Sequence, residues 1–190
     1  MRMTSAEKAS IEIRPMTGSD YPQVRVILQN GMDTGEATYE RVAPQWNVFS
    51  KNRHMSLAFV AEETNEDGEK AIIGWVTAAP TSHREALRGV IEDSIYVSSA
   101  AKGKGVAGRL LDHLLKAAAE QGFWVMHSSI FPENVASIKL HESRGFEKVG
   151  VLHRMGLMEY GRKAGQWRDV VYMQRILENG PAWEAPAEES

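Results

Sequence analysis

Apolar residues recur along the chain with two different periods, which predicts a mixture of short strands and helices. Alternating or continuous apolar stretches predict strands at 11–15, 57–62, 71–79, 90–98, 124–130, 146–152 and 167–177. Apolar positions three to four residues apart, after capping residues or a proline, predict helices at 20–32, 44–53, 106–121 and 134–144. Strands and helices that alternate in this way are typical of mixed α/β layers.

Polar, turn-forming residues connect these elements. Residues 64–68 form a polar turn that predicts a β-hairpin from the two strands beside it. Polar loops are expected at 33–39 and at 80–89, the second of which carries arginines. The end of the chain is acidic and rich in proline, which is typical of disorder. The expected organisation is a flexible tail at 1–10, one domain at 11–177 and an acidic flexible tail at 178–190.

Composition narrows the class of protein. A chain of 190 residues with 43% apolar residues is long enough to bury a core as one domain. The formal net charge of -3 argues against nucleic acid as the main partner, because phosphate backbones select clustered basic residues. No apolar run approaches the ~20 residues of a membrane helix, and the N-terminus lacks the pattern of a signal peptide. Zero cysteines fit a reducing compartment and leave no acyl-cysteine intermediate, so we expect a cytoplasmic protein.

Residues 92–108 place an acidic residue, a β-branched strand and a basic, glycine-rich turn directly before a helix. The turn offers up to six consecutive main-chain N–H groups, from Lys102 to Ala107, and its glycines let a ligand approach the backbone closely. The helix is amphipathic, is ended by Gly122, and presents its positive dipole end to the turn. The segment therefore predicts a pyrophosphate site. The apolar stripe of the helix is Val106, Leu110, Leu111, Leu114, Leu115 and Ala118.

Two other phosphate-binding motifs fit this turn poorly. Residues 103–108 spell G-x-G-x-x-G, but a dinucleotide site needs an acidic residue about 20 positions later, at the end of the next strand. That strand, 124–130, contains no acidic residue. A Walker A loop needs Ser or Thr after Gly103-Lys104, where the chain has Gly105. A nicotinamide-dependent oxidoreductase is therefore the weakest of the functions considered.

Two ordered motifs resemble those of the GNAT superfamily of N-acetyltransferases. Residues 102–107 are similar to the pyrophosphate loop Gln/Arg-x-x-Gly-x-Gly/Ala, with lysine in the first position, and 134–146 are similar to Asn-x-x-Ala/Ser-x-x-Leu-Tyr-x-x-x-Gly-Phe. The resemblance spans 11–177. It implies a central mixed, mostly antiparallel sheet flanked by helices, with acetyl-CoA as cosubstrate. It assigns the cofactor site to Ile95, Tyr96, Val97, Lys102, Gly103, Lys104, Gly105, Val106, Ala107, Asn134 and Ser137.

A subfamily is indicated by two further segments. Residues 163–169 are similar to the Lys-x-Gly-x-Trp-x-Asp element of phosphinothricin and methionine sulfoximine acetyltransferases, and 92–97 are similar to their acidic strand. Those enzymes acetylate the α-amine of small amino-acid analogues and are usually homodimers. The resemblance thus implies a small-molecule amine substrate and a homodimer.

The chemistry needs a base, a group that binds the oxyanion and a proton donor. An α-amine, with a reference pKa of ~7.7 to 8.0, is largely protonated at neutral pH, so a carboxylate or a water that it holds should act as base. Glu92 fits this role, whereas Asp93 should face the other side of its strand. In the family a bulge splays this strand and frees main-chain N–H groups for the oxyanion, here from Ile95 to Val97. His141 takes the position of the family's tyrosine that protonates the thiolate.

The acceptor site is less determined by the sequence. Arg84 and Arg88 correspond to basic positions in relatives and would bind a substrate carboxylate, while Thr34 and Trp167 are expected to line the pocket. The remaining histidines have no metal-ligand spacing, so no metal is predicted. Two alternatives stay open: an acetyltransferase for another amine (a polyamine, a lysine or a protein N-terminus), or a CoA-binding module without turnover.

Overall fold

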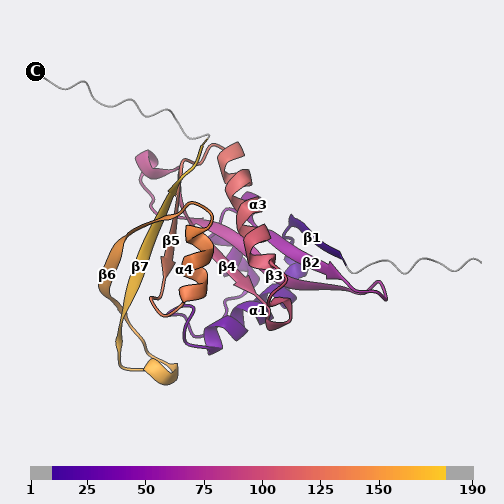
Figure 1. The fold of residues 1–190 in the computed structure, drawn as a ribbon, viewed down its shortest axis with the longest axis horizontal. Helices are drawn as coiled ribbons and strands as arrows, with labels where there is room; N and C mark the ends of the chain where they lie inside the picture. Colours follow the sequence, from indigo (N-terminus) through magenta and orange to yellow (C-terminus); the bar gives the residue numbers. More distant parts are fainter. Residues whose placement is uncertain (1–9, 179–190) are drawn as a thin grey trace, which may run out of the picture.

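The computed structural model describes residues 10–178, in which helices pack against both faces of a seven-stranded sheet (Figure 1). The strand order is β1-β2-β3-β4-β5-β7-β6, and all neighbours are antiparallel except β4 and β5, which are parallel. The predicted mixed, mostly antiparallel sheet is confirmed. The strands are β1 (Ser10–Pro15), β2 (Phe59–Thr64), β3 (Lys70–Pro80), β4 (Val90–Val97), β5 (Val125–Ile130), β6 (Glu147–Leu157) and β7 (Trp167–Ile176).

The helices lie where the periodicity places them. They are α1 (Tyr21–Asp33), α2 (Trp46–Lys51), α3 (Val106–Glu120) and α4 (Val135–Glu142), with short 3-10 turns at Gly18–Asp20, Met55–Leu57, Glu85–Leu87, Ser99–Ala101 and Gly161–Lys163. The first of these turns begins α1 and has a reciprocal capping box between Thr17 and Asp20. No described helix is long and apolar enough to cross a membrane.

Two hydrophobic cores lie on opposite faces of the sheet. The predicted stripe of α3 is buried throughout and packs against β2, β3 and β4. The other core joins α1 and α2 to the sheet around Phe49 and Trp75, both fully buried. Trp75 and Val76 are adjacent on β3 and enter different cores, as the alternation of a strand requires. The sheet is thus held from both sides at its centre.

One strand is longer than its sequence predicts. β6 was expected to end at Leu152 but continues to Leu157. Its pairing with β7 shifts register between Leu152 and Gly156, where Arg154 has a φ of 54°. The irregular backbone lets the ladder continue after the alternation of apolar residues has stopped, which hides it from the pattern. The predicted tails lie almost entirely outside the described residues.

The feature that positions the site is the separation of β4 from β5. These strands pair only from Val90 to Glu92, opposite Val125 to His127, and then diverge. β5 continues along β7 as far as Ile130. β4 stays on β3 in one uninterrupted register from Ile91 to Val97. The last five residues of β4 therefore have a strand on one side only.

Candidate active site

Two adjoining cavities open at the gap between β4 and β5. The first, of about 230 Å³, is lined from β4, β5 and α4, and includes Asp93, Ile95, Val97, Ser128, Asn134, Ser137 and His141. The second, of about 300 Å³, is lined by Ala79, Glu92 and the loop residues Ala37, Thr38 and Tyr39. Both are bounded by Ser94, Tyr96, Ser129 and Phe131. Two groups bound one in each cavity would therefore come into contact at the open edge of β4.

The hydrogen-bond pattern of β4 determines which main-chain groups face this gap. Ser98 N–H donates to Ile73 O at 2.9 Å, in the same register that pairs Tyr96 with Trp75. In an antiparallel ladder alternate residues bond to the partner strand, so Tyr96 N–H faces β3 while the N–H groups of Ile95 and Val97 face the gap. Tyr96 is thereby removed from the predicted oxyanion donors. The free donors come from the departure of β5 and not from a bulge, because the β3–β4 register is unbroken.

Two carboxylates line the second cavity, Glu92 and Asp93, and Asp93 is paired with His141. Glu92 is half-buried, lies beside Ala79 and His127 in the sheet, and makes no ion pair among the described residues. Burial raises the pKa of the two tyrosines that line the same cavity, Tyr39 and Tyr96, the latter to about 12. Both phenols stay neutral at physiological pH, so Glu92 is the side chain placed to accept a proton.

His141 lies at the other side of the gap and is 1% exposed. Its Nδ1 is 2.8 Å from Ser137 O, and its Nε2 is 3.1 Å from both Asp93 Oδ2 and Ser128 Oγ. Burial by itself lowers the pKa of His141, but the hydrogen bond and charge of Asp93, with the Ser137 carbonyl, outweigh it and raise that pKa above its usual value. His141 is thus held as a proton donor.

Asn134 and Ser137 line the same cavity from the start of α4. The Asn134 side chain accepts from Ser137 N–H at 3.1 Å, so it caps the helix. This cap fixes the first turn of α4 against the cavity wall.

The glycine-rich turn borders a groove of about 540 Å³. Gly103 and Gly105 have φ values of 79° and 70°, and a Cβ on either would meet no atom within 4 Å. The N–H groups of Lys102 and Lys104 donate to Ser99 O and Ala101 O, so the expected run of six free donors is wrong. Four N–H groups have no acceptor among the described residues, those of Gly103, Gly105, Val106 and Ala107.

Two basic side chains line this groove. Lys102 lines it, whereas Lys104 turns away to pair with Glu63 at 2.6 Å. Arg144 lines the opposite wall and bonds Asp112 at 3.2 Å. Arg144 was not among the predicted residues, because it stands at an unspecified position of its motif. Free N–H groups, two cations and open space beside glycines fit a pyrophosphate.

A buried arginine fixes the loop that lines the second cavity. Arg168 is 3% exposed, donates to Gly35 O at 3.0 Å, and pairs with Glu36 at 2.8 Å and Glu133 at 3.1 Å. Its guanidinium also lies 3.9 Å from the centroid of the Phe131 ring. Arg168 therefore connects the 33–39 loop to the segment between β5 and α4. Sequence analysis missed it, since it occupies a variable position in the 163–169 element.

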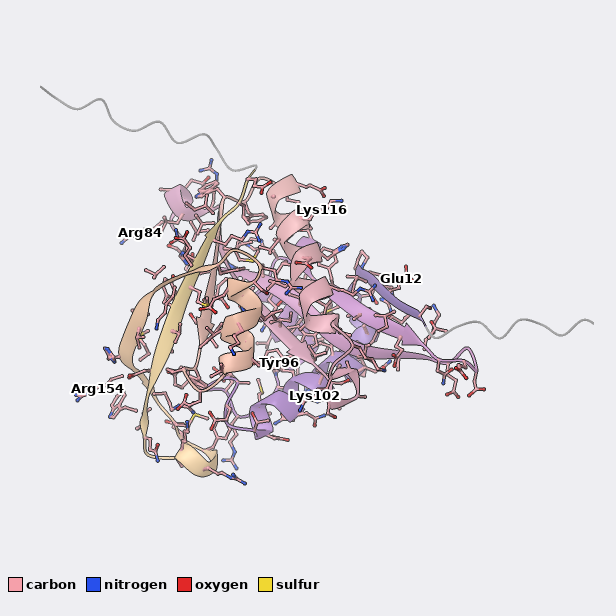
Figure 2. The ribbon with its side chains drawn as sticks, viewed as in Figure 1. Glu12, Arg84, Tyr96, Lys102, Lys116 and Arg154 are labelled. Atoms are coloured by element: carbon pink, nitrogen blue, oxygen red, sulfur yellow. The ribbon has the colours of Figure 1, made fainter. Side chains whose placement is uncertain are left out.

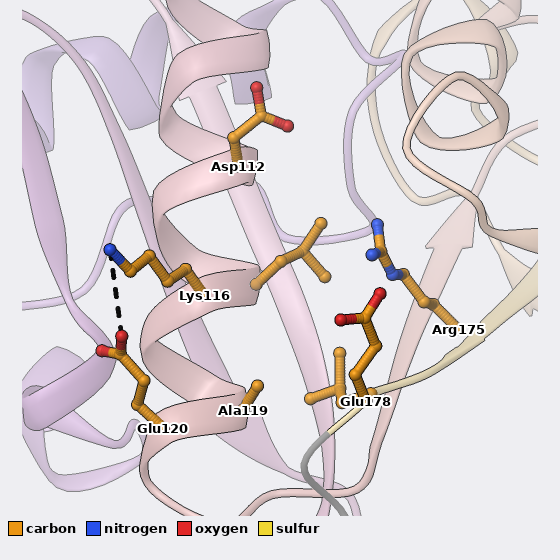
Figure 3. A pocket seen from close by; sticks show the side chains of 8 residues that line it. Asp112, Lys116, Ala119, Glu120, Arg175 and Glu178 are labelled. Carbon is orange, nitrogen blue, oxygen red and sulfur yellow. Dashed lines mark ion pairs between the residues drawn. The ribbon is translucent and has the colours of Figure 1, made fainter.

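A separate hollow of about 410 Å³ lies between α3 and the end of β7 (Figure 3). Acidic and basic side chains line it, and Lys116 pairs with Glu120 at 3.9 Å. It contains none of the predicted site residues. The candidate catalytic residues lie instead at the gap between β4 and β5.

Comparison with known proteins identifies the family. The profile of the acetyltransferase (GNAT) family matches residues 23–146. The chain belongs to the GNAT family. It is an acetyl-CoA-dependent N-acetyltransferase.

Relatives of this acetyltransferase carry related names. A phosphinothricin N-acetyltransferase of Alcaligenes faecalis is 32% identical over 91% of this chain and 86% of the relative. An L-methionine sulfoximine/L-methionine sulfone acetyltransferase of Pseudomonas paraeruginosa is 35% identical over 63% and 66% of the two chains. The crystal structure of a phosphinothricin acetyltransferase from Sinorhizobium meliloti in complex with AcCoA matches with a TM-score of 0.77, 31% identity and 94% coverage of both chains.

Four residues predicted for the acceptor site of this acetyltransferase line neither cavity. Thr34 is exposed and bonds Gly31 O, while Trp167 is 60% exposed at the surface. Arg84 lies at the other end of β4 from Tyr96 (Figure 2). Arg88 pairs with Glu85 at 3.4 Å and lies 5.4 Å from the Trp124 ring. Among the described residues no group of three metal-ligating side chains is found.

Proposed function

We propose that this acetyltransferase transfers the acetyl group of acetyl-CoA to the α-amine of a small amino-acid analogue of the phosphinothricin, methionine sulfoximine or methionine sulfone type. One observation carries the proposal: Glu92 and His141 face the same gap from opposite sides, in a chain whose relatives bear these names. The amine is expected in the second cavity, beside Glu92. The acetyl group is expected in the first, beside His141.

The transfer is direct, within a ternary complex. Glu92, directly or through a water, takes a proton from the amine, which then attacks the thioester carbonyl. The N–H groups of Ile95 and Val97 bind the oxygen that becomes negative, and their orientation is fixed before the reaction by the β3–β4 ladder. His141 is the source of the proton for the thiolate. The chain has no cysteine for an acyl-enzyme intermediate.

The cofactor is held by the chain in two places. The free N–H groups of the glycine turn, with Lys102, are proposed to bind the pyrophosphate. Asn134 and Ser137 are proposed to contact the pantetheine arm, because both line the first cavity. Arg84 and Arg88 line neither cavity, but their loop follows β3, which carries the cavity residue Ala79, and they are proposed to bind the acceptor carboxylate from outside the second cavity.

The exposed edge of the sheet supports a homodimer. β6 is an edge strand, and the β6–β7 ribbon exposes six large apolar side chains, five of them on β6 or at the start of β7. Exposed apolar patches of this kind are typical of protein interfaces. We assign the surface to a second copy of the chain. Its residues are Val149, Leu152, Met155, Leu157 and Trp167.

A second acceptor class is favoured by one observation. Glu36 and Glu92 line the two cavities, and no lysine or arginine among the described residues does so. This charge suits a cationic acceptor such as a polyamine or a lysine side chain.

An acceptor screen with acetyl-CoA separates these functions. Thiol release is measured with phosphinothricin, methionine sulfoximine and methionine sulfone, and with spermidine and lysine in parallel. Turnover of the first three above background is expected. Turnover of spermidine or lysine alone would instead assign a cationic amine as the acceptor. Binding of acetyl-CoA by calorimetry with no turnover of any amine would instead indicate a CoA-binding module.

A further inference from the structure

Both ring nitrogens of His141 are occupied by protein groups. The Ser137 carbonyl can only accept a hydrogen bond, so the contact at 2.8 Å requires a proton on Nδ1. Nε2 lies 3.1 Å from Asp93 Oδ2 and 3.1 Å from Ser128 Oγ. Neither N–H points freely into the cavity. A proton from His141 therefore has no direct path to the thiolate.

Asp93 keeps Nε2 protonated. Its side chain is 1% exposed, and its Oδ1 atom has no hydrogen-bond partner among the described residues. A buried carboxylate with so few partners requires a positive charge beside it, and the imidazolium of His141 supplies that charge. The other charged group near His141 is Arg144, which acts in the opposite direction from the end of the same helix. On β5 the ring contacts the neutral Ser128, and just before β6 it meets Phe146 edge to face.

Ser128 lies beside His141 on the wall of the first cavity. It lies on β5, is 4% exposed, and lines the first cavity with His141. Its Oγ accepts from Nε2–H, which leaves its own O–H without an acceptor among the described residues. The Ser128 hydroxyl can thus donate its proton and receive another from His141 Nε2.

We propose that Ser128 is the catalytic residue that protonates the departing thiolate, with His141 resupplying its proton and Asp93 as the positioning residue that holds the imidazolium. This inference rests on the proposed acetyl transfer and adds to it two residues that the sequence did not assign.

The proton transfers balance. Collapse of the tetrahedral adduct breaks the C–S bond and leaves the electron pair on sulfur. The Ser128 O–H bond breaks as an S–H bond forms, and the Nε2 proton moves to Ser128 Oγ. His141 becomes a neutral imidazole that keeps Nδ1–H on Ser137 O, while Asp93 stays a carboxylate. A solvent proton restores the imidazolium after the thiol leaves.

Substitution of Ser128 tests the terminal donor. Ser128→Ala should lower kcat by about 10²-fold with little change in KM for acetyl-CoA, because one general acid is removed. Ser128→Thr keeps the hydroxyl and should restore most of the rate. Ser19→Ala, on an exposed turn, is the matched control. A Ser128→Ala enzyme with unchanged kcat, or a Ser128→Thr enzyme as slow as Ser128→Ala with normal folding, would overturn the role of Ser128.

Nuclear magnetic resonance of His141 tests the pair without any acceptor. In the wild-type chain the imidazole should carry Nδ1–H and lose its Nε2 proton at a pH above the usual histidine range. Asp93→Asn should move that titration to lower pH, and Asp67→Asn, on the hairpin turn, should leave it unchanged. The alkaline fall of kcat should move by the same amount. Identical titration of His141 in wild type and Asp93→Asn would refute the coupling, whereas failure of the amino-acid analogues as acceptors would not alter this result.

Discussion

His141 Nε2 donates to Asp93 Oδ2 at 3.1 Å, and this contact fastens α4 to the stretch of β4 that β5 has left. Glu92, the residue before Asp93, lines the second cavity but not the first, whereas Asp93 lines both. The two adjacent carboxylates are therefore proposed to have separate functions. Glu92 would accept the proton of the amine, and Asp93 would hold His141, the source of the proton for the thiolate.

Glu92→Gln is expected to lower kcat/KM by about 10²- to 10³-fold, chiefly at acidic to neutral pH, because the amine is then protonated and needs a base. At a pH above the pKa of the amine the loss should shrink. The measurement is a pH profile of thiol release. Glu85→Gln, in the exposed loop before β4, is the control and should retain the wild-type profile. A profile of unchanged shape in Glu92→Gln would exclude Glu92 as the base.

Gly105→Ala is expected to weaken acetyl-CoA binding. Gly105 has a φ of 70° at the start of α3, where an alanine is strained by about 1 to 2 kcal/mol, and its relaxation moves the free N–H groups of the turn. A rise of KM for acetyl-CoA should exceed any change in kcat. Gly150→Ala is the matched control, because its Cβ meets no atom and its φ is not positive. Equal kinetic effects of the two variants would contradict a role for the turn geometry.

Arg168→Met is expected to destabilise the 33–39 loop, which lines the second cavity. Removal of Arg168 deletes its hydrogen bond to Gly35 O and its pairs with Glu36 and Glu133. Both carboxylates are about half exposed and keep Lys163 as a partner, so the cost is about 1 to 3 kcal/mol. The Tm should fall and KM for the acceptor should rise more than KM for acetyl-CoA. Arg162→Met, six residues earlier and exposed, should change neither. Equal rises in both KM values would show that Arg168 stabilises the whole fold and not this loop.

The ion pair between Arg14 and Asp20, just before α1, should contribute less to the unfolding free energy in acid. Arg14 binds Asp20 at 2.8 Å and Glu62 at 2.6 Å, and this hydrogen bond to Arg14 holds the pKa of Asp20 at about 2. A carboxylate with a depressed pKa stabilises the fold above its unfolded value near 3.8, and this contribution disappears as the pH falls from about 4 to 2. Its size is about 2 kcal/mol. Asp20→Asn should therefore be less stable at pH 7 and show a smaller loss of unfolding free energy over this range, measured by urea denaturation. Parallel curves for the two proteins would contradict the assignment.

Leu157→Lys combined with Met155→Lys is expected to produce monomers if the β6–β7 surface joins two copies. Both side chains are exposed and apolar in the single chain. Sedimentation equilibrium should give a dimer for the wild type and for Val42→Lys, an exposed apolar position on the loop before α2. A monomeric wild type, or a dimeric double variant, would place the interface elsewhere or remove it.

Local physics explains how much was predictable. The stripe of α3, the hairpin of β2 and β3, and the left-handed Gly103 and Gly105 follow from side-chain period and from the conformations glycine permits, which are properties of short segments. The extension of β6 was not visible, because an irregular edge strand has no alternation to detect. The sequence therefore determined the elements, the phosphate turn and the candidate acid and base.

Tertiary structure decided how these parts meet. The gap depends on where β5 leaves β4, which is a matter of sheet topology and not of either strand's sequence. Asp93 and His141 are 48 positions apart, and Arg168 lies 132 positions from Glu36, so neither contact has a local signal. Burial then gives these pairs their chemical effect, because the free energy of a charge removed from water depends on its nearest partner. That partner is set by packing alone.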